Sequence, residues 1–71
     1  MANMRVAQAQ WNHAREHRFA ASKAQDPRVA AAHVAAADAL HAVGEATARG
    51  KPTAELAALA DQLHIAAHAI V

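Results

Sequence analysis

Apolar and small residues recur at alternating steps of four and three along two stretches of the chain, residues 27–49 and 54–70. This spacing places them on one face of an α-helix. Each series forms one narrow stripe, and the two stripes match in length, which predicts an antiparallel helical hairpin. The stripe positions are Val29, His33, Ala36, Leu40, Val43 and Thr47 in the first stretch, and Leu56, Leu59, Leu63, Ala66 and Ile70 in the second.

Residues that start and stop helices flank both stretches. Asp26 can cap the first stretch, and Pro27 suits the first helical position because its missing N–H costs nothing there. Gly50 can adopt the left-handed conformation that closes a helix, and Pro52 prevents the helix from continuing. Thr53 is then expected to cap the second stretch. The connection between the two helices is therefore short.

A third, N-terminal helix is predicted over about residues 3–25, but it is less clearly amphipathic. Met4 and Trp11 belong to one apolar stripe, whereas Val6 and Ala20 belong to another on the opposite side. Two faces suggest two contacts, one with the hairpin and one with a neighbouring molecule. The chain is thus expected to be all-α, with three helices in a single small domain over residues 1–71.

The composition predicts a thin core. Of the apolar residues 24 are alanine and 15 are larger, and alanine favours helix while burying little area. A homo-oligomer or a protein partner is therefore expected to complete the core. Trp11 and Phe19 are the aromatic anchors of the expected interface. The full set of expected interface residues is Met4, Trp11, Phe19, Leu56, Leu59, Leu63, Ile65 and Ile70.

The net charge of +1 hides an asymmetry, because residues 1–28 carry +3 and residues 29–71 carry −2. This balance is far from that of a dedicated nucleic-acid binder, and the basic residues form no continuous helical stripe. The alanine-rich stretch 54–70 also offers few donors to read bases. Nucleic acid is therefore a disfavoured partner, and a small nucleic-acid-binding regulator is the second alternative.

The chain contains no cysteine and no apolar run near 18 residues. We therefore expect a soluble cytoplasmic protein without a membrane span. His13, Glu16 and His17 match the H-x-x-E-H pattern of inverted zinc peptidases, in which two histidines hold zinc and the glutamate is the general base. A chain of this size leaves little room for a third ligand and a substrate cleft, so we expect no enzyme.

Six histidines in 71 residues are the most unusual polar feature. The pairs His13/His17 and His64/His68 have the i, i+4 spacing that can chelate one ion. In the predicted hairpin, His33 and His41 share one face with the second pair. Three interpretations compete for this face: ordinary helix surface, a metal or haem site, and a pH-sensitive interface. The candidate ligands are His33, His41, His64 and His68, with His13 and His17 as a lesser pair.

The sequence therefore favours a non-catalytic interaction or assembly module without a cofactor. The alternative is a histidine-based protein that binds zinc, another transition metal or haem.

Overall fold

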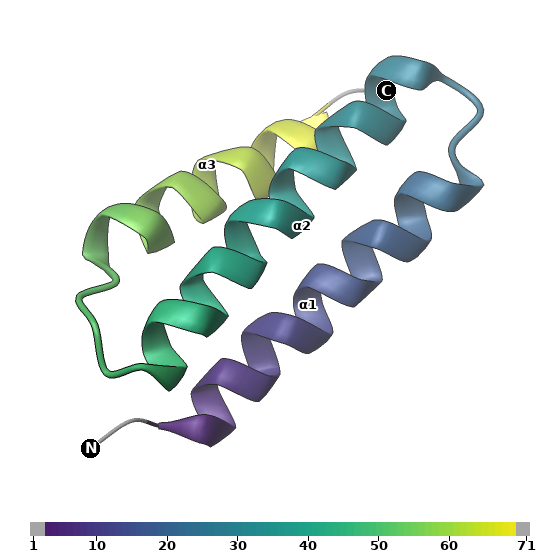
Figure 1. The fold of residues 1–71 in the computed structure, drawn as a ribbon. Helices are drawn as coiled ribbons and strands as arrows, with labels where there is room; N and C mark the ends of the chain where they lie inside the picture. The colour runs from purple at the N-terminus through teal and green to yellow at the C-terminus, as the bar shows by residue number, and fades with distance from the viewer. Residues whose placement is uncertain (1–2, 70–71) are drawn as a thin grey trace.

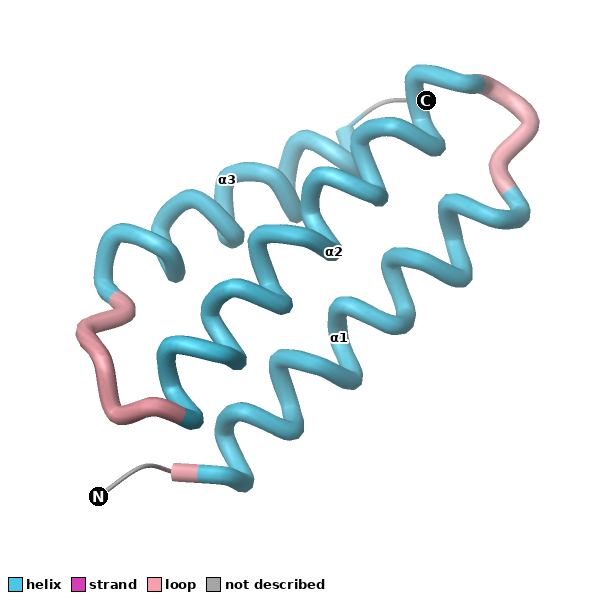
Figure 2. The backbone as a smooth tube through the Cα atoms, in the orientation of Figure 1, coloured by secondary structure: helices cyan, strands magenta, loops and turns pink. Residues whose placement is uncertain are grey.

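The computed structural model describes residues 3–69, and the regular secondary structure within them is entirely α-helical. The helices are α1 (Met4–Lys23), α2 (Pro27–Ala48) and α3 (Ala54–Ala69). Figure 1 shows them side by side with α2 in the middle. The two connections lie at opposite ends of the molecule (Figure 2). Within residues 3–69, no helix is both long enough and apolar enough to cross a membrane.

Local sequence explains where α2 begins and ends. The Asp26 side chain accepts a hydrogen bond from the Arg28 N–H at 2.8 Å, and Pro27 opens the helix, as predicted. At the other end Gly50 has φ +68°, which a residue with a Cβ rarely adopts. The Gly50 N–H donates to the Thr47 carbonyl and the Lys51 N–H to the Ala46 carbonyl. This pair of bonds is the Schellman arrangement, which satisfies carbonyls left free by the helix end.

The other helix starts use simpler devices. The Asn3 side chain caps α1 by accepting from the Val6 N–H at 3.1 Å. α3 begins directly after Thr53, whose carbonyl accepts from the Ala57 N–H at 2.7 Å. Thr53 therefore occupies the predicted capping position and contributes its backbone carbonyl to the first intrahelical bond.

The core lies on both sides of α2 and consists mostly of alanine. Leu40 and Val43 are its largest buried apolar side chains, and no large side chain in the described residues is completely buried. Leu56 and Leu63 of α3 are half-buried against it. Small side chains let the helix backbones approach closely but remove little apolar area from water. The predicted thin core is therefore present.

The packed face of α3 differs from the predicted stripe. Ala60 and Ala67 are buried, whereas Leu59 is 47% exposed and Ala66 also faces solvent. The packed series Leu56, Ala60, Leu63 and Ala67 keeps the steps of four and three. The packed face is therefore rotated about the axis of α3, away from Leu59. Because Ala60 and Ala67 lie beside the leucine stripe, a rotation of α3 toward them still presents an apolar face, and the helical period alone does not fix this rotation.

Helix-to-helix packing in the described residues is confined to α1 with α2 and to α2 with α3. The Cα atoms consequently form a flat layer with principal extents of 41, 19 and 12 Å. α1 and α3 approach each other only through long side chains that cross one face of α2. Those side chains are histidines.

Candidate metal centre

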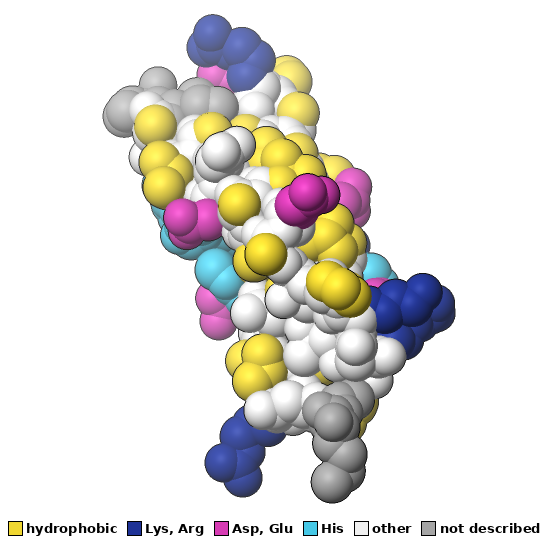
Figure 3. Space-filling view, turned by 90° about the vertical axis from the view of Figure 1, so that its left-hand side faces the viewer, with side chains coloured by type: hydrophobic (Ala, Val, Ile, Leu, Met, Phe, Trp, Pro, Cys, Tyr) yellow, Lys and Arg dark blue, Asp and Glu magenta, His cyan; other side chains and the backbone are white. Residues whose placement is uncertain are grey.

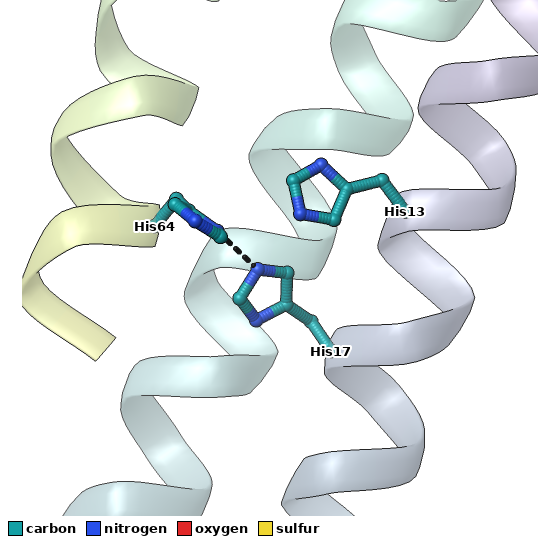
Figure 4. A group of neighbouring side chains, drawn as sticks. All are labelled: His13, His17 and His64. Carbon is teal, nitrogen blue, oxygen red and sulfur yellow. Dashed lines mark hydrogen bonds between the residues drawn. The ribbon is translucent and has the colours of Figure 1, made fainter. Parts of the chain in front are cut away.

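Five of the six histidines gather on one face of the layer. His13 and His17 come from α1, His33 from α2, and His64 and His68 from α3. The i, i+4 spacing aligns each pair on its own helix, so the ring centroids are 5.0 Å apart for His13/His17 and 4.6 Å for His64/His68. Figure 4 shows His13 and His17 reaching across α2 toward His64.

His17 lies at the centre of this cluster and is only 3% exposed. Its Nδ1 lies 2.8 Å from Nδ1 of His33, and its Nε2 lies 2.8 Å from Nδ1 of His64. A neutral imidazole has one N–H and one lone pair. His17 therefore donates to one neighbour and accepts from the other, which links all three helices through one ring.

The remaining two histidines flank this chain of hydrogen bonds. The His13 ring lies 4.8 Å from that of His64, and the His68 ring lies 5.5 Å from that of His33. One ligand nitrogen from each of His13, His17 and His64 lies within 4.8 Å of the other two. The five histidines, with Glu16 and Ala20, line a cavity of about 140 Å³.

The cluster disfavours the protonated form of its central ring. Burial, followed by the proximity of His13, His33, His64 and His68, lowers the pKa of His17 from 6.5 to about 4. The pKa of His64 is also lowered, first by burial and then by His13 and His68, while Asp61 opposes the shift. His17 is consequently neutral at pH 7, the form in which imidazole binds metals.

The chain has no match among known proteins that would suggest a role for this cluster. No family model, curated protein or solved structure matches it. The side-chain chemistry of the cluster is therefore the guide to its function. Imidazoles serve in proteins as metal ligands, as proton-dependent switches and as acid–base groups in catalysis.

The composition of the cluster differs from the face expected on the hairpin. His33, His64 and His68 come together, but His41 lies apart, with its ring 6.4 Å from that of Trp11 and its Nε2 3.5 Å from Glu45. Eight residues separate His33 from His41, which is about 12 Å along the axis and about 80° around it. His13 and His17 of α1 join the cluster instead of His41. The sequence feature that indicates this is the i, i+4 spacing that this pair shares with His64/His68.

Trp11 is half-buried within the chain. It packs on Gly44 of α2, where an added Cβ would lie 2.4 Å from Trp11 Nε1. That Nε1–H is buried without a hydrogen-bond partner. A glycine inside an alanine-rich helix costs about 1 kcal/mol relative to alanine, and here it provides the space for the indole. The helical period of the sequence does not indicate this contact between α1 and α2.

The other expected interface residues divide by exposure. Leu56 and Leu63 are half-buried against the core, and Ile70 lies outside the described residues. The exposed members are Met4 at 54%, Phe19 at 64%, Leu59 at 47% and Ile65 at 60%.

Charged residues of α1 and its flank are partly paired within the chain. Arg18 of α1 lies 3.3 Å from Asp38 of α2, and Arg28 lies 3.0 Å from Asp26. Both pairs are largely exposed, so each contributes little to stability. The Arg18–Asp38 pair matches the charge asymmetry of the sequence, in which a basic first helix faces a more acidic remainder.

Proposed function

We propose that the protein binds a transition-metal ion through His13, His17 and His64, and that its role is binding rather than catalysis. The observation that carries this proposal is the convergence of three imidazole nitrogens from two separate helices within 4.8 Å of one another. His33 and His68 lie next to this triad. Chance placement on helix surfaces does not readily gather four histidines around a fifth, His17, that is buried.

The dimensions of the triad fit an ion after small side-chain rotations. Three nitrogens that bind zinc at about 2.0–2.1 Å in a tetrahedral arrangement lie about 3.4 Å apart. Imidazole suits zinc, copper and nickel. The cavity of about 140 Å³ is well below the roughly 300 Å³ at which small-molecule pockets begin, so it favours a bare ion over haem.

The cost of the cluster to folding supports a binding role. His17 and His33 are 3% and 7% exposed, and burial of these rings disfavours their protonated form. An alanine-rich core of this size has little apolar burial with which to offset that cost. Both nitrogens of His17 are hydrogen-bonded to neighbouring histidines, so an ion would replace these bonds and add its binding free energy to folding.

Isothermal titration of the protein with Zn²⁺ at pH 7 tests this proposal. His64→Ala should weaken binding by more than the roughly 10- to 100-fold that loss of an outer-shell partner costs, because it removes one ligand of three. His41→Ala is the matched control, since it removes a histidine outside the cluster and should leave affinity unchanged. Equal affinity of the His64→Ala protein and the unaltered chain would refute the assignment.

We also propose self-association as a second function, in keeping with the exposed apolar residues. The accessible surface is 4819 Å², compared with about 4,200 Å² typical of a monomer of this mass. Figure 3 faces the α3 side and shows hydrophobic side chains distributed among charged ones there. Ile65 is 60% exposed and is the more exposed of the large apolar residues given for α3, so a second copy could cover it.

Sedimentation equilibrium with the Ile65→Glu variant tests association. A charge at this position should reduce the mass to that of one chain of 7.4 kDa, because a buried unpaired carboxylate disfavours an interface. Ala66→Glu introduces the same charge about 100° around α3 and should leave the mass unchanged. A single-chain mass for the unaltered protein would exclude this second function.

A further inference from the structure

The two ring nitrogens of His17 face two different sets of histidines. Nε2 points to His64, which has His13 beside it, and Nδ1 points to His33, which has His68 beside it. The cluster therefore offers two sets of three histidines, or triads, that share His17. In the first, nitrogens of His13, His17 and His64 already converge within 4.8 Å. In the second, the rings of His33 and His68 are 5.5 Å apart, and His68 must turn away from His64, whose ring is 4.6 Å from its own. The metal triad described above is one half of this arrangement.

We infer that the cluster binds two transition-metal ions bridged by His17 as an imidazolate, an inference that rests on the proposed metal-binding function. The first ion takes Nε2 of His17 with His13 and His64. The second takes Nδ1 of His17 with His33 and His68. Each ion then has three nitrogen ligands and keeps an open position for water, as metal sites with three protein ligands do.

Proton balance distinguishes the two binding steps. Neutral His17 has one lone pair and one N–H. The first ion binds the lone pair of Nε2, and the proton stays on Nδ1, directed at His33. The second ion forms the Nδ1–metal bond as the Nδ1–H bond breaks, and the proton passes to buffer. No electron is transferred, so the step needs no oxidant or reductant.

The spacing of the rings allows this arrangement. The 2.8 Å separations between His17 and its two partners must each widen to about 3.4 Å to admit a tetrahedral ion. His68 is exposed, and His13 and His64 are only half-buried, so their rings can rotate. The shared cavity lies beside all five rings. Two ions on opposite nitrogens of one imidazolate lie about 6 Å apart, given metal–nitrogen bonds of about 2.0 Å.

Titration with Cu²⁺ followed by electron paramagnetic resonance tests the bridge, because it reports spin coupling between ions directly. The His41→Ala protein is the form to titrate, since it lacks the histidine outside the cluster. The copper signal should grow up to one equivalent and then disappear as the second equivalent binds, because two bridged unpaired electrons couple to a spin-paired ground state. Binding of the second ion should also release one additional proton.

Removal of a ligand from the second triad should leave a single uncoupled copper. His68→Ala is the preferred variant because this side chain is exposed and its loss spares the core. His33→Ala removes another ligand of the same triad and should have the same effect. Circular dichroism of each variant verifies that the helices are retained.

The outcomes separate this inference from the proposed function. One copper per chain with a persistent signal would overturn the bridge and leave the single-ion site in place. Two coppers with additive, uncoupled signals would also overturn the bridge, since the ions would then occupy independent sites. Failure to bind any copper or zinc would overturn both proposals.

Discussion

Acidification of the metal-free protein from pH 7 to pH 4.5 should lower its free energy of unfolding by roughly 2–3 kcal/mol. The pKa of His17 is about 4 in the folded chain and about 6.5 in an unfolded one. Between these values the unfolded state binds the proton and the folded state does not. Each pH unit below 6.5 therefore favours unfolding by about 1.4 kcal/mol.

The direction of this effect follows from the lowered pKa. The stability contribution is fully present above pH 6.5 and is lost as the pH falls toward 4. His64 shifts in the same direction and adds to the loss. Small domains are stable by only about 0.05–0.15 kcal/mol per residue, so acid should remove a sizeable part of the free energy of unfolding.

Urea unfolding followed by circular dichroism at pH 7, 5.5 and 4.5 measures this dependence. The lowest pH, 4.5, lies above the usual pKa values of Asp and Glu, about 3.9–4.3. Histidines therefore dominate the change in the free energy of unfolding. His17→Leu should flatten the profile, because it removes the buried ionisable ring and substitutes an apolar side chain. His41→Ala should retain it. A urea midpoint in the unaltered protein that stays constant across this range would contradict the prediction.

Gly44→Val should destabilise the protein by about 3 kcal/mol, near the upper end of overpacking costs. The added Cβ would lie 2.4 Å from Nε1 and 2.6 Å from Cδ1 of Trp11, closer than nonbonded atoms can approach. The indole must then leave its position on α2. Thermal or urea unfolding measures the loss, and Trp11 fluorescence reports the displacement of the ring.

A double-mutant cycle with Trp11→Leu identifies the contact as the cause. In that background Gly44→Val should cost less than about 1 kcal/mol, because the smaller side chain leaves space for the methyl groups. Ala31→Val is the matched control on an exposed position of α2 and should cost only its helix propensity, about 0.6 kcal/mol. Equal costs of Gly44→Val in both backgrounds would exclude Trp11 as the reason.

The sequence by itself determined the three helices and the residues that begin or end α2. Those features depend on local chemistry: a carboxylate at Asp26 that accepts backbone N–H groups, a Pro27 that fits the first turn, and a Gly50 that tolerates positive φ. The i, i+4 histidine pairs are equally local, because a helix alone aligns them. These properties need no information from distant parts of the chain.

Only the tertiary structure decided which faces meet. Alanine is spread over several faces of α2 and α3, so more than one rotation presents a small surface. The rotation adopted depends on contacts between distant residues, such as Trp11 with Gly44. The same packing of the helix faces places His17 between His33 and His64 and leaves His41 outside the cluster. The helical period could align histidines on one helix, but the packing of α1 and α3 on α2 was required to gather four of them around the buried His17.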